Sequence, residues 1–233
     1  MRAFKVDHAG HPALGYIIGS RTTSGLKAEY QKLSGKELKE LVKSGISIKD
    51  PPIEKIEVGY TGDTCANGLM KQQITTATDN DKSTTGFDIG QMFQAEVLLC
   101  ELTFLDSSEG EEQRIKARQR GHLHINDLEA IFSSHNQLKE DETESNSTTI
   151  TSQEYPKSIV FYHLSAKYRP AKRAMDYIAE GLPQQLIDRC YVALSSMLTQ
   201  EEQACDFSIS KHNGCVSLKE YLSWKDAVDN AIS

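Results

Sequence analysis

The sequence predicts a layered α/β fold, because segments typical of strands alternate with segments typical of helices. Five short stretches are rich in β-branched and aromatic residues and bounded by turn formers: 14–20, 55–61, 96–104, 158–164 and 189–195. With 233 residues, 38% of them hydrophobic and 25% charged, the chain is long enough to bury the core of one to two ordinary globular domains.

Two helices are predicted from their start signals and their apolar spacing. Asn126 is expected to cap a helix over 126–132, with Glu129 completing a capping box. The apolar residues on one face of this helix are Leu128, Ile131 and Phe132. A second helix is expected to follow Pro170, whose fixed backbone suits a first helical turn. Its apolar face comprises Ala171, Ala174, Met175 and Ile178.

Two stretches interrupt the alternation of strands and helices. Residues 72–86 are mostly Thr, Asp, Asn and Lys, and residues 137–153 join an acidic run to Ser and Thr repeats. Neither offers apolar side chains for burial, so both are predicted to be low-complexity surface insertions. The tail over 199–233 ends in an amphipathic pattern whose role the sequence does not indicate.

Composition excludes several classes of protein. No apolar run approaches the roughly 20 residues of a membrane span, and the first residues do not look like a secretion signal. Five cysteines without a CxxC pair argue against a disulfide scaffold, so an intracellular protein is expected, in the cytoplasm, the nucleus or an organelle. A net charge of −7 argues against coating nucleic acid through overall charge, although local basic patches remain compatible with it.

Polar residues capable of chemistry stand at the ends of three predicted strands: Asp63, Glu101 and His163. Ligands gather at the carboxyl ends of strands in α/β folds, so these side chains are expected to converge. His8 and His122 add imidazoles nearby in the predicted layout, and this mixture of donors suits zinc. A single His or Asp at a strand end is an ordinary turn residue, so the metal site is predicted from the convergence alone.

Five short motifs follow one another in order between Phe4 and about Leu198. They are Val6-Asp7-His8 with Pro12, Gly15 and Tyr16 after it, then Gly59–Thr64, Glu96–Asp106, Arg120–His124 and Tyr162–Tyr168. As a set they resemble the C-terminal half of ribonuclease Z, the tRNA 3′-processing endonuclease of the metallo-β-lactamase superfamily, particularly its short plant-type forms. The resemblance implies a metallo-β-lactamase fold, an αββα sandwich, of which residues 1–198 would form the C-terminal half only.

The resemblance also implies roles for individual residues. His8 would bind one zinc, His163 the other, and Asp63 would bridge the two. Glu101 and His122 would be the catalytic pair that moves protons during cleavage. Two metals roughly 3.5 to 4 Å apart activate a water and stabilise charge on the phosphate oxygens.

Two further histidines lie close to these residues in the sequence. His11, one residue before Pro12, is an alternative to His8 as the zinc ligand. His124 is expected to support the ligands or to be structural.

The sequence departs from the family pattern in two ways. Cys100 and Leu102 replace the His and Ala of the commoner motif around Glu101. The superfamily's His-x-His-x-Asp-His motif occurs nowhere in the 233 residues, which leaves two zinc sites with too few ligands. The chain is therefore expected not to be a competent nuclease alone. It would be a fragment, be completed by a separate or upstream N-terminal half, or be a non-catalytic remnant.

The segment 21–49 carries seven basic and three acidic residues, a local net charge of +4. In ribonuclease Z an arm at this position grips the tRNA elbow, which implies RNA-binding roles for Lys27, Lys32, Lys36, Lys39 and Lys43. The alternative is a solvated helix face whose lysines pair with Glu37 and Glu40. A second basic cluster beside His163 would hold the RNA 3′ end or simply be a charged helix start; it comprises Lys167, Arg169, Lys172 and Arg173.

The function predicted from these observations is a zinc-dependent endoribonuclease that removes 3′ trailers from precursor tRNA. The resemblance also implies a homodimer. Two alternatives remain: a non-catalytic RNA-binding or scaffolding protein that kept the fold, and a hydrolase of the same fold acting on another substrate.

Overall fold

The computed structural model describes the chain except for residues 24, 71–88, 137–155, 195–214 and 233. The two predicted insertions, 72–86 and 137–153, lie outside the described residues, as does the first part of the predicted tail.

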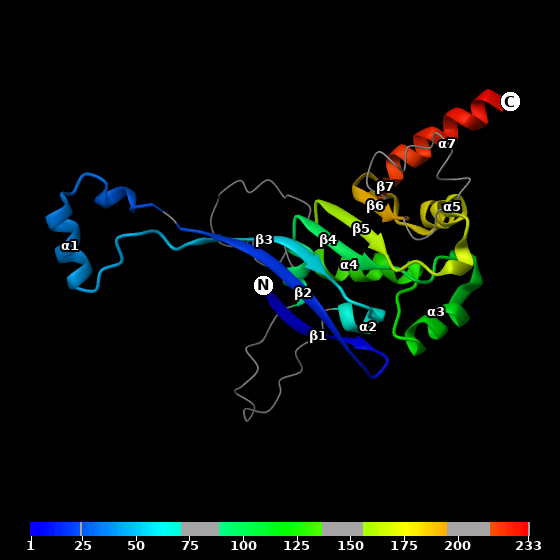
Figure 1. Cartoon of the computed structure of the whole chain (residues 1–233), viewed down its shortest axis with the longest axis horizontal. Coiled ribbons are helices and arrows are strands. Elements are labelled where there is room, and N and C mark those ends of the chain that lie inside the picture. The colour runs from blue at the N-terminus through cyan, green and yellow to red at the C-terminus, as the bar shows by residue number, and fades with distance from the viewer. Residues whose placement is uncertain (24, 71–88, 137–155, 195–214, 233) are drawn as a thin grey trace.

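Seven strands form one sheet in which the spatial order follows the chain order (Figure 1). The strands are β1 (Arg2–His8), β2 (His11–Thr22), β3 (Ile53–Tyr60), β4 (Val97–Glu101), β5 (Ser158–Tyr162), β6 (Cys190–Ala193) and β7 (Cys215–Ser217). The strands from β3 to β6 are parallel, whereas β1, β2 and β3 pair antiparallel at one edge and β6 with β7 at the other. All five predicted strands are present, and β1 and β7 extend the sheet beyond them.

The helices alternate with the strands, as a mixed α/β fold requires. They are α1 (Gly35–Lys43), α2 (Ala66–Leu69), α3 (Gly110–Gln119), α4 (Leu128–Asn136), α5 (Ala171–Gly181) and α7 (Leu218–Ile232). Short 3₁₀ turns occupy Ala28–Tyr30, Ile89–Gln94, Ser107–Glu109, Ile125–Asp127, Ala166–Tyr168 and Gln184–Arg189. No helix within the described ranges is long and apolar enough to cross a membrane.

The core lies on one face of the sheet. Alternate side chains of the central strands are fully buried there: Leu98, Cys100, Ile159, Phe161, Cys190 and Val192. The four residues predicted for the apolar face of α5 are buried in the same core, as are Leu128, Ile131 and Phe132. We refer to this side as the covered face.

The opposite face, called the open face below, is apolar but only partly buried. Tyr16, Tyr60 and Tyr162 stack across it, with ring centroids 6.1 Å and 5.3 Å apart. Leu99, Val160 and Tyr191 also keep partial exposure, and Ile18 is 47% exposed. Parallel strands are normally covered on both faces. Within the described part of the chain, only one face of this sheet is buried to that extent.

The predicted start of the helix at Asn126 is wrong. The helix is preceded by the 3₁₀ turn Ile125–Asp127, and its cap is His124, whose Nδ1 accepts the backbone N–H of Asn126 at 3.1 Å. The side chain of Asn126 donates instead to the carbonyl of Ser107, 3.1 Å away. A buried imidazole at the start of the turn replaces the expected asparagine cap, so His124 has a structural role.

The segment between β2 and β3 projects from the sheet as an arm (Figure 1). The two strands continue outward as a ribbon held by a bridge between Leu26 and Lys49 and by a hydrogen bond from Lys27 N–H to the Ile48 carbonyl, 3.0 Å long. At its end lies α1, capped by Ser34 and Glu37 in a capping box. No residue of α1 is buried, so the arm presents its helix to the surroundings.

Candidate functional site

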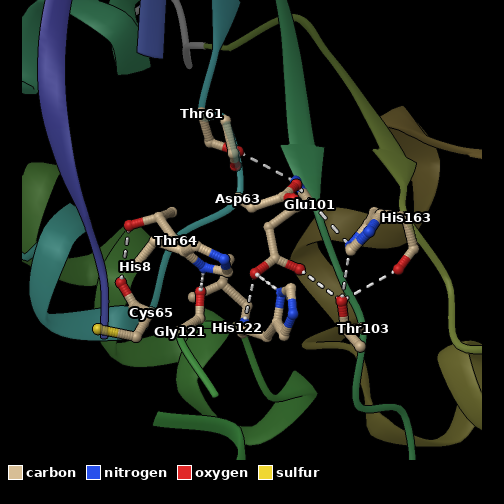
Figure 2. A network of polar contacts seen from close by, with 12 residues as sticks. His8, Thr61, Asp63, Thr64, Cys65, Glu101, Thr103, Gly121, His122 and His163 are labelled. Carbon is tan, nitrogen blue, oxygen red and sulfur yellow. Dashed lines mark hydrogen bonds and ion pairs between the residues drawn. The ribbon is translucent and has the colours of Figure 1, made fainter. Parts of the chain in front are cut away.

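The carboxyl ends of β3, β4 and β5 bring three predicted residues together (Figure 2). Asp63 follows β3, Glu101 is the last residue of β4 and His163 directly follows β5. Because these strands are parallel neighbours, their carboxyl ends lie at one edge of the sheet. His122 reaches the same place from the loop after α3.

The distances define a compact cluster of possible metal ligands. One ligand atom each from Glu101, His122 and His163 lies within 4.8 Å of the other two. Asp63 Oδ1 lies 3.8 Å from Nδ1 of His163. The convergence expected from the strand ends is therefore present, and it includes His122.

Glu101 is completely buried, and both of its carboxylate oxygens are engaged. Oε1 accepts the backbone N–H of Leu123 at 2.6 Å, and Oε2 accepts the hydroxyl of Thr103 at 3.0 Å. Burial raises the pKa of Glu101, and the contacts with His122, Leu123 and Thr103 only partly offset this rise. A carboxylate held this way is better placed to orient a neighbour than to leave its partners for a metal.

That neighbour is His122, whose Nδ1 lies 3.5 Å from Oε1 of Glu101. The interaction with Glu101 raises the pKa of His122, burial opposes the rise and the charge of Asp63 adds to it. An imidazole that holds its proton more tightly and is oriented by a buried carboxylate can act as a general acid.

Thr103 links the carboxylate to His163. Its Oγ1 lies 3.0 Å from Oε2 of Glu101 and 3.0 Å from both Nδ1 and the carbonyl oxygen of His163. If the hydroxyl donates its one proton to Glu101, it accepts Nδ1–H of His163, which leaves Nε2 of that imidazole free for a metal. His163 also has a φ of +62°, a strained conformation for a non-glycine residue and one that recurs at functional sites.

His8 is held in a comparable way at the end of β1. Its Nδ1 lies 2.8 Å from the carbonyl oxygen of Gly121, so an Nδ1–H tautomer presents Nε2 as a ligand. Its ring centroid is 5.0 Å from that of His122. Gly121 has a φ of +77°, and a side chain there would collide with His8. The alternative ligand His11 is exposed on β2, with its ring centroid 5.8 Å from that of His8.

The donors present fit the zinc that the motifs imply. Imidazole nitrogens of His8 and His163 and the carboxylate of Asp63 are ligand types that zinc accepts, and two of the imidazoles have a hydrogen-bond partner on Nδ1. When bound there, zinc would supply a water of lowered pKa and a positive charge next to the phosphate. The His122–Glu101 pair lies beside these donors, where it would hold or release a proton.

Sequence reasoning did not assign a role to Thr103 or Gly121. Thr103 belongs to the motif that ends β4, and Gly121 directly precedes His122, so both lay beside residues already singled out. Their contacts join segments far apart in the sequence, which no local pattern reports.

The structure places four of the five arm lysines on or beside α1. Lys36, Lys39 and Lys43 follow one another at intervals of three and four residues, which aligns them along one side of α1, and Lys32 lies in the turn before its Ser34 cap. Lys43 pairs with Glu40 at 2.9 Å, whereas Glu37 is engaged by the Ser34 cap at 2.7 Å. The intrahelical pairing considered as an alternative therefore accounts for Lys43, and Lys32, Lys36 and Lys39 have no ion pair with a described residue.

The remaining predicted RNA-binding residues lie elsewhere. Lys27, in the ribbon leading to α1, has its Nζ 6.0 Å from the ring centroid of Tyr30. Lys167 and Arg169 are exposed on the turn after His163, and Nζ of Lys167 lies 4.6 Å from the ring centroid of Tyr168.

Comparisons with known proteins agree with the motifs. No family model matches the chain. The chain is 36% identical over 128 residues to tRNase Z TRZ1 of Arabidopsis thaliana and 30% identical over 128 residues to the chloroplastic tRNase Z TRZ2 of the same plant. Each alignment covers 55% of this chain but only 38% and 30% of the respective relatives, so the chain matches about a third of their length. The chain is thus a distant homologue of the plant tRNase Z proteins.

Proposed function

We propose that the chain supplies the C-terminal half of a zinc-dependent endoribonuclease that removes 3′ trailers from precursor tRNA. The observation that carries the proposal is the cluster of Glu101, His122 and His163 within 4.8 Å, with Asp63 beside it. These residues come from four separate motifs, and they meet at the one edge of the sheet where an α/β fold places its chemistry.

The hydrogen bonds of the cluster suggest a role for each of its side chains. His8, Asp63 and His163 hold the two zinc ions. Glu101 keeps His122 protonated and oriented, and His122 gives its proton to the leaving ribose 3′ oxygen. The lysines of α1 hold the tRNA through its phosphates, which confers affinity without reading sequence.

The remaining zinc ligands would come from an N-terminal half, upstream or separate. The open face supports this part of the proposal, because a second sheet packed on Tyr16, Tyr60 and Tyr162 would complete an αββα sandwich. We expect the homodimer that the family implies to form from chains that include this N-terminal half.

The test is to compare the chain alone with the chain joined to the N-terminal half of the TRZ1 relative. Elemental analysis measures zinc, and a precursor tRNA with a 3′ trailer measures cleavage. We expect zinc and cleavage in the joined form only. His163→Ala should lower the zinc content, whereas His122→Ala should keep zinc and lose about 10²- to 10⁴-fold in rate. His8→Ala should lower the zinc content too, and His11→Ala is its matched control, because it removes an exposed imidazole from the same hairpin.

Other outcomes would overturn the proposal. No zinc in either form, combined with tRNA binding that depends on Lys32, Lys36 and Lys39, would indicate a non-catalytic RNA-binding protein. Zinc-dependent cleavage of a simple phosphodiester without cleavage of precursor tRNA would indicate a hydrolase of another substrate.

A further inference from the structure

A group of cations and aromatic rings in mutual contact extends from the turn after β5 across α5 to α7, with the Tyr168 ring buried beneath the exposed cations. We call it the α5–α7 strip, and it consists of Lys167, Tyr168, Lys172, Arg173, Tyr177 and Trp224. Nζ of Lys172 lies 5.8 Å from the ring centroid of Trp224. The guanidinium of Arg173 lies 5.5 Å from the ring centroid of Tyr177 and donates to its hydroxyl at 3.4 Å.

The strip begins beside the candidate metal cluster. Lys167 is four residues after His163, and its Nζ lies 4.6 Å from the ring centroid of Tyr168. Tyr168 in turn meets Tyr177 edge to face, with ring centroids 5.3 Å apart. The side-chain contacts therefore continue from the cluster along α5.

Trp224 is presented by a firmly docked helix. The Tyr221 hydroxyl donates to Oδ1 of Asp176 at 2.7 Å, and Nζ of Lys225 reaches the same oxygen at 2.7 Å. Tyr221 is buried, so these contacts fix α7 against α5. Trp224 is 38% exposed, and its ring centroid lies 5.8 Å from Nζ of Lys172.

The local charge is positive although the chain carries −7 overall. The side chains of Lys167, Lys172 and Arg173 are exposed, and so is that of Arg169. Asp176 on α5 is engaged by Tyr221 and Lys225, and Oδ1 of Asp106 accepts from Ser108 at 2.6 Å, whereas Glu220 and Asp226 are exposed on α7. The positive charge of the strip is therefore concentrated at Lys167, Lys172 and Arg173, with the indole of Trp224 at the far end.

We propose that the α5–α7 strip binds single-stranded RNA, with a base stacked on Trp224 and the flanking phosphates on Lys172 and Arg173. Single strands are held by this combination of cations along the backbone and aromatic platforms for the bases, without sequence preference. The lysines of α1 have no aromatic residue between them, so they are suited to bind the phosphates of a folded RNA instead. The inference rests on the proposed function, because it assigns the unpaired RNA next to the cleaved bond to this strip.

Trp224 is the only tryptophan of the chain, so its fluorescence reports on the strip directly. The chain is titrated with an oligouridylate of about ten nucleotides and, separately, with a fully paired RNA of the same phosphate content. We expect the oligouridylate to quench the emission, with an affinity that falls as salt rises. The paired RNA should quench it much less, because its bases are not free to stack.

Variants test the two parts of the strip. Trp224→Ala, followed by anisotropy of a labelled oligouridylate, should weaken binding about 5- to 150-fold, the range expected for the loss of one stacked base. Lys172→Gln should weaken binding as well. Lys219→Gln is the matched control, because it removes the same charge from α7 at a position where Lys219 pairs with Asp188, 3.1 Å away.

The proposal is overturned if oligouridylate leaves the emission unchanged, if Trp224→Ala binds as tightly as the parent, or if Lys219→Gln weakens binding as much as Lys172→Gln. Failure of the proposed function is a separate result. The oligouridylate could quench the emission as expected while the joined form leaves precursor tRNA uncut. That result would support the strip as an RNA-binding site and reject the nuclease function.

Discussion

The covered and open faces of the sheet differ in burial although the same strands supply both. Phe161 points to the covered face and is fully buried, whereas its neighbour Val160 on the open face is partly exposed. Cys100 and Leu99 on β4 differ in the same way. Both faces are apolar, a composition typical of parallel strands covered on two sides. This difference in burial indicates that the covered face stabilises the chain, whereas the open face has the composition of an interface.

The largest expected effect comes from the covered face. Phe161→Ala should lower the free energy of unfolding by about 3 to 5 kcal/mol, because it removes a buried ring and leaves a cavity. Val160→Ala on the same strand should cost about 1 kcal/mol or less, since the side chain is only partly buried. Denaturant titrations of the two variants measure the contrast. Equal costs would mean that the two faces are equally packed.

Thiol labelling of the native chain compares the faces without disturbing them. Burial raises the pKa of Cys190 to about 12 and that of Cys100 well above its usual value, so neither forms thiolate readily. Cys215, on β7 at the open face, is only partly buried. In a Cys205→Ser background, Cys215 should react about a hundredfold faster than Cys100 or Cys190. Similar rates would show that the open face is shielded.

Two tyrosines offer a smaller, matched contrast. Tyr168 is buried, and its hydroxyl accepts the backbone N–H of Leu105 at 2.9 Å. Tyr168→Phe should therefore cost about 1 to 3 kcal/mol of stability, because the buried donor loses its acceptor. The hydroxyl of Tyr162, on the open face, lies 3.4 Å from that of Thr61, which has another partner in the Gly62 carbonyl. Tyr162→Phe should cost less than about 1 kcal/mol by thermal unfolding, and a larger loss would contradict the contrast.

The smallest effect sharpens the interpretation of the open face. Val160→Thr changes shape little and should alter the stability of the isolated chain by about 0.5 kcal/mol or less. In the form joined to an N-terminal half, the same change should cost about 1 to 3 kcal/mol, because the hydroxyl is then buried. An unchanged cost on joining would mean that the second half does not cover this face.

The sequence was sufficient for the parts of the fold that rest on local pattern. The strands β2 to β6 and the helix α5 were predicted because apolar spacing and turn residues mark them. The strand β1 holds only one β-branched and one aromatic residue among charged ones, so it lacks the enrichment that marks the other strands, and β7 has three residues, too few for a period to appear. The asparagine cap failed because the helical turn begins two residues earlier, where buried His124 accepts the backbone N–H of Asn126, and the Asn126 side chain donates to the Ser107 carbonyl instead.

The candidate site was predictable to the extent that strand order fixes it. Asp63, Glu101 and His163 follow parallel neighbours, so their meeting follows from topology. The tautomers of His8 and His163 depend on Gly121 and Thr103, which lie 113 and 60 residues away in the chain. Such contacts are set by packing, and spacing along the sequence carries no record of them.

The arm has a consequence for how this protein could vary. It leaves the sheet at Thr22 and returns at Ile53, two residues that are paired across β2 and β3. Because the entropy of closing a loop grows only with the logarithm of its length, doubling the arm would cost about 0.6 kcal/mol. A tight turn could replace it at similarly little expense to folding. The fold of the sheet is therefore independent of the length and sequence of the arm, and exchanging the arm between homologues would change the proposed RNA binding without changing the sheet.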